Sequence, residues 1–118
     1  MNLEQIINSS NSDEEIDNKC IEIFINDVQS DFESFLKFPL YKYFVNYSTG
    51  IGYIEAHIGM QNKLAKARQK GRGGWWREDC SVELLYNLLE EHEAKRNDGN
   101  DIDLCNFSMF IYFKEFKK

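Results

Sequence analysis

The last third of the sequence contains four side chains whose types and spacing suit a metal site: Glu90, Glu93, Asp103 and Asn106. Glu90 and Glu93 are three residues apart in one predicted helix, and Asp103 and Asn106 are three apart in the next, so each pair shares a helix face. Oxygen ligands on facing helices suit a hard cation such as Mg²⁺, which holds phosphate oxygens and polarises an attacking water. The two glutamates are therefore candidate catalytic and metal-binding residues, and Asp103 and Asn106 are candidate metal ligands.

Each of these residues also has a structural interpretation. Glu90 suits a solvent-exposed helix face, where two acids three residues apart are common. Asp103 lies among phenylalanines, so it needs a partner to offset its desolvation; it can cap its own helix or pair with Lys63 or Arg68. His92 falls in the middle of the apolar stripe of its helix, which favours a hydrogen-bonded core histidine. The pattern leaves the chemical and the structural interpretations open.

The second candidate for chemistry is the segment "KGRGGWW", residues 70–76. Glycines let backbone N–H groups approach an anion closely, and the guanidinium of Arg72 matches phosphate. A tryptophan can stack on a base, although one tryptophan is also expected to anchor the loop, and the lysines before it also suit the end of a helix dipole. The spacing matches no Walker or Rossmann fingerprint. The candidate nucleotide-binding residues are Lys63, Lys66, Lys70, Arg72, Trp75 and Trp76.

The elements that must position these residues are predicted to be mainly helical. Apolar residues recur at helical intervals over 13–37, which predicts a helix with a break near 27–31. Ser12 and Glu15 have the spacing of a capping box at its start. Further helices are predicted over residues 54–69, 79–96 and 101–116, with a turn at 97–100. We therefore expect a small, mainly α helical bundle.

The segment "YKYFVNYSTGIGY", residues 41–53, is ambiguous. Its aromatic and β-branched residues alternate with polar ones, and Ser-Thr-Gly makes a plausible turn, so a short β-hairpin is expected near residues 40–54. The alternative is a short helix that Pro39 opens and that closes near Gly50.

Length and composition indicate one domain of 118 residues, with residues 1–12 frayed. A net charge of −6 and a pI near 4.9 argue against a dedicated binder of duplex nucleic acid, although a nucleotide needs only a few local cations. No apolar run is long enough for a membrane span, and the N-terminus lacks the order of a signal peptide. Three widely spaced cysteines do not suggest a disulfide framework or a zinc knuckle. We expect a cytoplasmic protein that does not associate with membranes.

Residues 60–111 resemble the phage-borne MazG-like proteins of the all-α NTP pyrophosphohydrolase superfamily. The features that carry the resemblance are a Met-x-x-Lys-Leu-Ala helix, the Lys-Gly and Gly-Gly-Trp loop, Cys-Ser, a leucine helix with acids, and the closing "DLCNFSM". The resemblance covers slightly under half of the chain. It places a MazG-like helical part at residues 51–118 and leaves residues 13–50 without a family assignment.

The resemblance implies an oligomeric helical bundle that binds Mg²⁺ and cleaves nucleoside triphosphates to the monophosphate and pyrophosphate. Glu90 and Glu93 match an ExxE element, Asp103 matches the aspartate of an ExxD pair, and Asn106 matches the asparagine that follows. The ExxD glutamate would fall at Asn100, so the acidic set is incomplete. A chain that keeps the bundle but lacks a ligand would bind nucleotides without turnover.

Three functions follow from these patterns. The first is a Mg²⁺-dependent nucleotide pyrophosphohydrolase. The second is a non-catalytic nucleotide binder, such as a viral counter-defence protein that sequesters a nucleotide signal in the host cytoplasm. The third is an acidic protein that inhibits a host protein by direct binding. Of these functions we expect nucleotide binding. Mg²⁺ is expected as a cofactor only if the protein is an enzyme.

Overall fold

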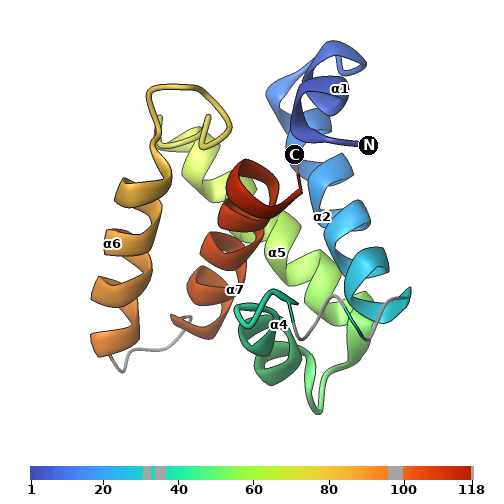
Figure 1. The fold of residues 1–118 in the computed structure, drawn as a ribbon, viewed down its shortest axis with the longest axis vertical. Coiled ribbons are helices and arrows are strands. Elements are labelled where there is room, and N and C mark those ends of the chain that lie inside the picture. Colours follow the sequence, from blue (N-terminus) through green and yellow to red (C-terminus); the bar gives the residue numbers. More distant parts are fainter. Residues whose placement is uncertain (31–32, 34–36, 96–99, 118) are drawn as a thin grey trace.

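The computed structural model of the protein describes residues 1–30, 33, 37–95 and 100–117, and most of these residues lie in helices. No β-strand occurs in these ranges, which confirms a mainly α protein. The central helix, α7, has α6 on one side, α2 and α5 on the other, and α4 near one end (Figure 1). The helices are α1 (Leu3–Asn8), α2 (Asp13–Ser30), α4 (Tyr41–Ser48), α5 (Gly52–Gln69), α6 (Val82–Ala94) and α7 (Asn100–Ile111), which continues into the π-helical turn η1 (Tyr112–Phe116).

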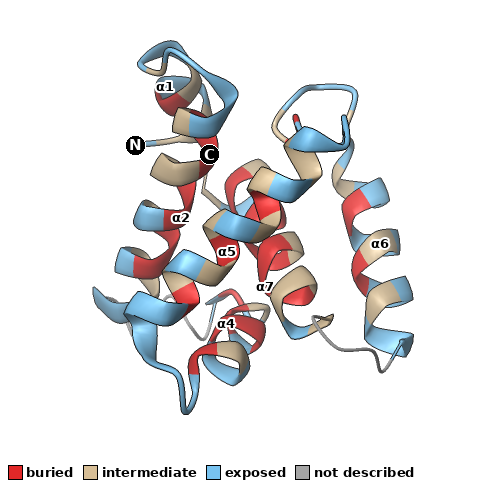
Figure 2. Ribbon diagram, turned by 180° about the vertical axis from the view of Figure 1, so that it is seen from behind, coloured by how far each residue is buried: buried red, intermediate tan, exposed pale blue. Residues whose placement is uncertain are grey.

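The central position of α7 follows from its composition. The helix is apolar on nearly all sides, and such a helix is stable only when other elements cover it on every face. α4, α5 and α6 provide this cover, and buried positions run from Leu104 to the end of α7 (Figure 2). Between α7 and α4 the core is rich in rings, with centroids 5.0–5.5 Å apart among Phe24, Phe38, Tyr41 and Tyr112. Such aromatic pairs add to the stability that burial provides.

The first helix differs from the expectation that residues 1–12 are frayed. Asn2 and Gln5 form a reciprocal capping box at the start of α1, and the side chain of Ile6 is fully buried. The predicted capping residue Ser12 accepts a hydrogen bond from the Glu15 backbone N–H at 3.1 Å and so starts α2. A cap and one buried side chain therefore order a segment that its polar composition had suggested was loose.

The β-hairpin expected near residues 40–54 is not present, and the alternative short helix is found instead. α4 begins two residues after Pro39, and the chain turns at Gly50, whose φ of 88° favours glycine. The physical reason is that Tyr41, Phe44 and Ser48 also recur at helical spacing, and all three are buried. Packing against the aromatic core therefore decided between two periodicities that the sequence satisfied equally.

The other predicted helices are present with small changes in their bounds. α5 begins two residues earlier than expected, and α6 begins at Val82, where Ser81 caps the helix by accepting from the Leu84 N–H at 3.1 Å. The helix predicted over 13–37 matches α2 up to Ser30, whereas most of its last part and most of the turn at 97–100 lie outside the described residues. None of the described helices is both long and apolar enough to cross a membrane.

A buried carboxylate joins three separate segments of this fold. Asp17 of α2 is 1% exposed; it forms an ion pair with Arg68 of α5 and accepts a hydrogen bond of 2.9 Å from the indole Nε1 of Trp75. The ring of Trp75 in turn stacks on Phe110 of α7, with centroids 4.4 Å apart and an interplanar angle of 14°. Burial raises the pKa of Asp17, and the hydrogen bonds from Trp75 and Arg68 counteract part of that rise. The network fixes the end of α5 and the following loop against α2 and α7.

Replacing this carboxylate should destabilise the protein strongly. Asp17→Ala leaves the Arg68 guanidinium and the Trp75 N–H without their partner, and breaking a buried pair in this way costs about 3 kcal/mol. Urea unfolding followed by circular dichroism measures the change. The control is Asp13→Ala, which removes an exposed ion pair of 3.7 Å with Arg77 and should cost at most about 1 kcal/mol. Equal losses for the two variants would contradict a structural role for the Asp17 network.

Candidate functional site

The candidate site is a pocket of about 380 Å³ between α5, α6, α7 and the loop that follows α5. Lys63, Lys66 and Lys70 line it from one face of α5, because residues three and four apart project on the same side of a helix. α7 contributes Asp103 and Asn106 together with two phenylalanines, Phe107 and Phe110. Both the volume and the mixture of apolar walls with a few polar groups are typical of sites for small ligands.

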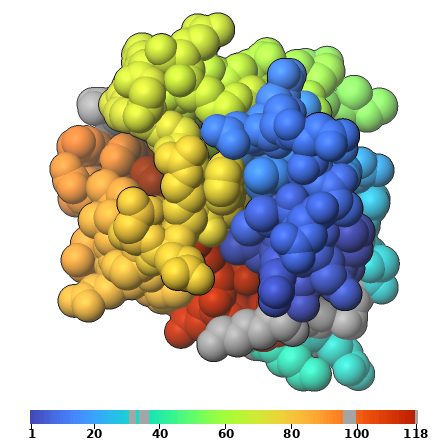
Figure 3. Space-filling model, turned by 90° about the horizontal axis from the view of Figure 1, so that it is seen from above, coloured from blue at the N-terminus to red at the C-terminus, as the bar shows by residue number. Residues whose placement is uncertain are grey.

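The glycine-rich loop is ordered by the way in which α5 ends. Gly71 has a φ of 74°, and its N–H bonds the carbonyl of Arg68 while the Arg72 N–H bonds that of Ala67 at 2.8 Å, as in a Schellman motif. These two backbone amides are therefore engaged by the helix and do not form an anion cradle. The loop reaches the pocket through Arg72, Gly73 and Trp75. Seen from above, it lies between α6 and the N-terminal helices (Figure 3).

Positive charge gathers on the rim of the pocket although the protein as a whole carries a net charge of −6. Lys63 lies 3.5 Å from a carboxylate oxygen of Asp103. Lys66, Lys70 and Arg72 form no ion pair with any residue in the described ranges. These three cations are free to bind the negative charges of a ligand.

The two tryptophans have different positions. Trp75 is 7% exposed and is held by Asp17 and Phe110, so it anchors the loop and contributes part of the pocket wall. Trp76 lies outside this pocket, next to the guanidinium of Arg77, which is 5.1 Å from its ring centroid. Of the predicted nucleotide-binding residues, the pocket brings together Lys63, Lys66, Lys70, Arg72 and Trp75.

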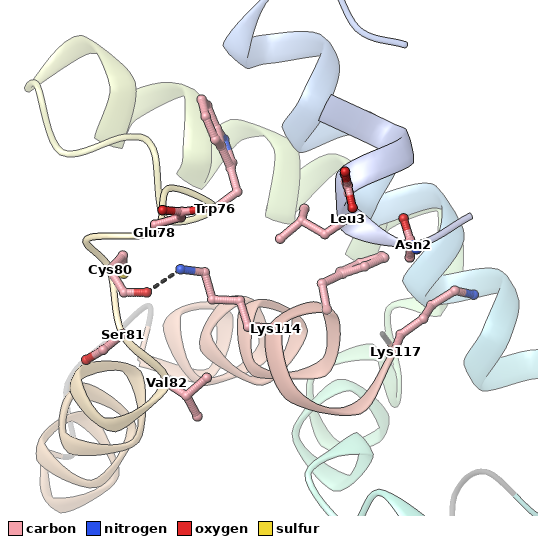
Figure 4. Close-up of a pocket in the computed structure, with 11 residues that line it drawn as sticks. Asn2, Leu3, Trp76, Glu78, Cys80, Ser81, Val82, Lys114 and Lys117 are labelled. Carbon is pink, nitrogen blue, oxygen red and sulfur yellow. Dashed lines mark hydrogen bonds between the residues drawn. The ribbon is translucent and has the colours of Figure 1, made fainter. Parts of the chain in front are cut away.

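Trp76 belongs instead to a shallow hollow between the N-terminus, the loop before α6 and the π-helical turn (Figure 4). There the amine of Lys114 donates hydrogen bonds to the backbone carbonyls of Arg77, at 2.7 Å, and of Cys80. Burial lowers the pKa of Lys114. The contacts of Lys114 hold the loop in place, so this lysine has a structural role in the hollow.

The four predicted metal ligands do not converge. Asp103 and Asn106 line the pocket, whereas Glu90 is exposed on α6 and does not line it. Glu93 is also exposed on α6 and does not line the pocket, and its carboxylate lies close enough to Tyr43 of α4 to raise the pKa of that phenol. Asn100, where the resemblance would place a further ligand, donates instead to the carbonyls of His92 and Lys95 at 2.6 and 2.8 Å, beside the end of α6.

The residues in place do not fit a Mg²⁺ site of the kind that the sequence suggested. Within the described ranges, no three His, Cys, Asp or Glu side chains are grouped so that they could hold a metal ion. Of the three predicted acidic ligands, Asp103 lines the pocket. Its carboxylate oxygens lie 3.5 Å from Lys63 Nζ and 3.9 Å from His92 Nε2, so it sits between two basic groups. A single carboxylate between basic side chains lacks the set of oxygen ligands that Mg²⁺ requires.

Asp103 is consequently an acceptor with free capacity. Its distances to Lys63 Nζ and to His92 Nε2 exceed the usual range of hydrogen bonds. The pairing with Lys63 is the structural alternative expected from the sequence. His92 is half-buried, its Nδ1 lies 2.9 Å from the Leu88 carbonyl, and its ring packs against Phe107, as expected for a hydrogen-bonded histidine on the apolar stripe.

The carboxamide of Asn106 is the most unusual group in the pocket. Asn106 is 3% exposed, and neither its Nδ2 nor its Oδ1 has a hydrogen-bond partner in the part of the chain that the structure describes. A buried donor or acceptor left without a partner costs about 1–3 kcal/mol. Because Asn106 lines the pocket, its carboxamide is the group whose hydrogen-bonding capacity a ligand there would complement.

Several lining residues were missed by the sequence analysis as parts of a site: Asp17, Leu88, Phe107 and Phe110. Asp17 had a usable signal, since it occupies a position in the apolar stripe that continues through Ile21 and Phe24. An acid in such a stripe requires a buried partner.

Comparisons with protein-family models, curated proteins and solved structures find no match.

The placement of Glu93 can be tested through the titration of Tyr43. Burial, together with the hydrogen bond to Glu93 and its negative charge, raises the pKa of Tyr43 to about 12. The neutral phenol therefore contributes stability that is complete below pH 10 and is lost as the pH rises through about 12. Glu93→Gln should lower this pKa, because it removes the negative charge beside the phenolate.

The measurement is the ultraviolet absorbance of tyrosinate against pH. The signal of Tyr43 is isolated by subtracting the titration curve of a Tyr43→Phe variant, made in the parent, in Glu93→Gln and in Glu90→Gln, from that of the corresponding protein. Glu90→Gln is the matched control on the same helix and should leave the midpoint of Tyr43 unchanged. A midpoint that responds to Glu90 and not to Glu93 would show that the two glutamates have been assigned to the wrong faces of α6.

Proposed function

We propose that the protein binds a nucleotide in the pocket between α5, α6 and α7, and that it does so without Mg²⁺-dependent turnover. The observation that carries this proposal is the combination, in one pocket, of three cations without ion pairs and a buried carboxamide without partners among the described residues. The cations Lys66, Lys70 and Arg72 suit phosphate oxygens. The aromatic walls and the amide suit a flat polar ring.

The charge balance favours a ligand with about three negative charges. Lys63 is already compensated in part by Asp103, so the free positive charge comes from three side chains. A nucleoside diphosphate carries about this charge at neutral pH, given a second phosphate pKa near 6. The wider MazG-like resemblance remains a proposal, and it agrees with a ligand of this kind.

The absence of a converged acidic set within the described ranges is why the non-catalytic function is preferred to a pyrophosphohydrolase. Hydrolysis in the proposed family depends on Mg²⁺ held by several carboxylates, and here neither Glu90 nor Glu93 lines the pocket. Binding without turnover suits a protein that sequesters a nucleotide, which is the role expected of a viral counter-defence protein. Glu90 and Glu93 therefore have no catalytic role in this proposal.

A panel of nucleotides in a thermal-shift experiment tests the proposal. A ligand at about 100 times its Kd stabilises the native state by about 2.7 kcal/mol, which raises the Tm of a domain of this size by about 10 °C. We expect this increase for at least one nucleoside diphosphate or triphosphate in EDTA as well as in Mg²⁺. Stabilisation that requires Mg²⁺ would favour the enzyme instead, and no stabilisation by any nucleotide would favour a protein-binding function.

The role of the loop cation can be measured separately. Arg72→Ala should raise the Kd of the bound nucleotide by about 10-fold or more, since a hydrogen bond to a charged group contributes about 1.5–3 kcal/mol. Arg77→Ala is the matched control, because Arg77 is exposed on the same loop but does not line the pocket. Isothermal titration calorimetry gives both affinities. Equal effects of the two substitutions would mean that net charge, rather than this pocket, governs binding.

A further inference from the structure

The inner end of the pocket has a hydrogen-bonding pattern that is separate from its cationic rim. Asp103 and Asn106 lie about one turn apart on the same face of α7, and both line the pocket. Asn106 offers one N–H donor group and one carbonyl acceptor, both without partners in the described part of the chain. Asp103 offers only acceptors, and its two basic neighbours lie at 3.5 and 3.9 Å. Acceptors therefore exceed donors on this face.

Aromatic side chains flank these polar groups. Phe107 and Phe110 lie edge to face, with centroids 5.9 Å apart, and Trp75 stacks on the other side of Phe110. The ring of His92 contacts Phe107 at a centroid distance of 4.9 Å. An apolar, ring-lined space around a few polar atoms favours a flat heterocycle over a flexible polar chain. Every nucleobase has a flat face that can stack on an aromatic side chain.

We propose that the α7 face of the pocket is a subsite for a nucleobase that carries an exocyclic amino group, and this inference rests on the proposed nucleotide binding. Adenine and cytosine present an amino N–H donor at the ring position where hypoxanthine and uracil, respectively, present a carbonyl oxygen. The amino group donates to the Asp103 carboxylate, and the adjacent ring edge pairs with the Asn106 carboxamide. A carbonyl in the same place faces the carboxylate with two acceptors opposed, which is unfavourable.

Matched pairs of nucleotides isolate this effect. Adenosine and inosine diphosphates differ in an amino or a carbonyl group at one ring position, as do cytidine and uridine diphosphates, and each pair carries the same phosphates. Calorimetry in EDTA should show that the tightest ligand has the amino group and that its carbonyl counterpart binds about 10-fold or more weakly. Affinities within threefold in both pairs, or tighter binding of the carbonyl member, would overturn the inference.

Substitution of Asp103 tests the selection directly. Asp103→Asn replaces a group that only accepts with one that also donates, so the preference for the amino member should fall to near unity. Asp101→Asn is the control, because Asp101 is exposed in the same turn of α7 and does not line the pocket. An unchanged preference in Asp103→Asn would contradict the assignment of Asp103 to base recognition.

Substitution of Asn106 separates a ligand-binding role from a structural one. Asn106→Leu removes a buried amide that has no partner in the described ranges, so the free protein should have a higher Tm. The same variant should bind the preferred nucleotide about 10-fold or more weakly, while inorganic pyrophosphate, which reaches only the cationic rim, keeps its affinity. A lower Tm together with equal losses for both ligands would show that Asn106 supports the fold and does not contact a base.

The two proposals fail in different ways. If neither pyrophosphate nor any nucleotide binds, nucleotide binding fails and the base subsite fails with it. If pyrophosphate and all nucleotides bind with equal affinity, the cationic rim is a phosphate site and only the base subsite is wrong.

Discussion

The buried carboxylate of Asp17 is the constraint on which the arrangement of the pocket depends. A carboxylate that is 1% exposed requires partners, and it takes them from α5, through Arg68, and from the following loop, through Trp75. Trp75 then stacks on Phe110 and so fixes the loop against α7. Because the loop is held at this point, the space between α5, α6 and α7 stays open as a pocket bounded by rigid elements.

This arrangement divides the basic residues of an acidic protein into two groups. Arg68 is engaged by the core, and Lys114 is engaged by the loop before α6. Three cations on the pocket rim, Lys66, Lys70 and Arg72, form no ion pair within the described ranges, so they attract any ligand with several phosphates. Rim charges of this kind increase affinity for a whole class of anions but discriminate poorly among its members. In our account discrimination comes from Asp103 and Asn106, whose hydrogen-bonding capacity is directional.

The sequence predicted most of the fold and several of the residues that line the pocket, and the differences have identifiable causes. Helical periodicity and caps located α5, α6 and α7, and the basic residues of α5 and the loop were correctly grouped because helical spacing is a local property. The segment at 41–48 satisfied two periodicities, and only packing against the aromatic core selected the helix. The acids of α6 were assigned to a shared site because the packing of their helix was not known, and neither Glu90 nor Glu93 lines the pocket. Contacts between distant segments, including that of Asp17, require the tertiary structure.

The most direct test of the central claim is a nuclear magnetic resonance titration of ¹⁵N-labelled protein with an amino-bearing nucleoside diphosphate in EDTA. We predict that the side-chain amide resonance of Asn106 shifts and saturates at the same ligand concentration as the guanidinium resonance of Arg72. A ligand that connects the inner and outer ends of one pocket must affect both groups together. Shifts confined to Trp76 and its hollow, or an Asn106 amide that does not respond at saturating ligand, would contradict the account.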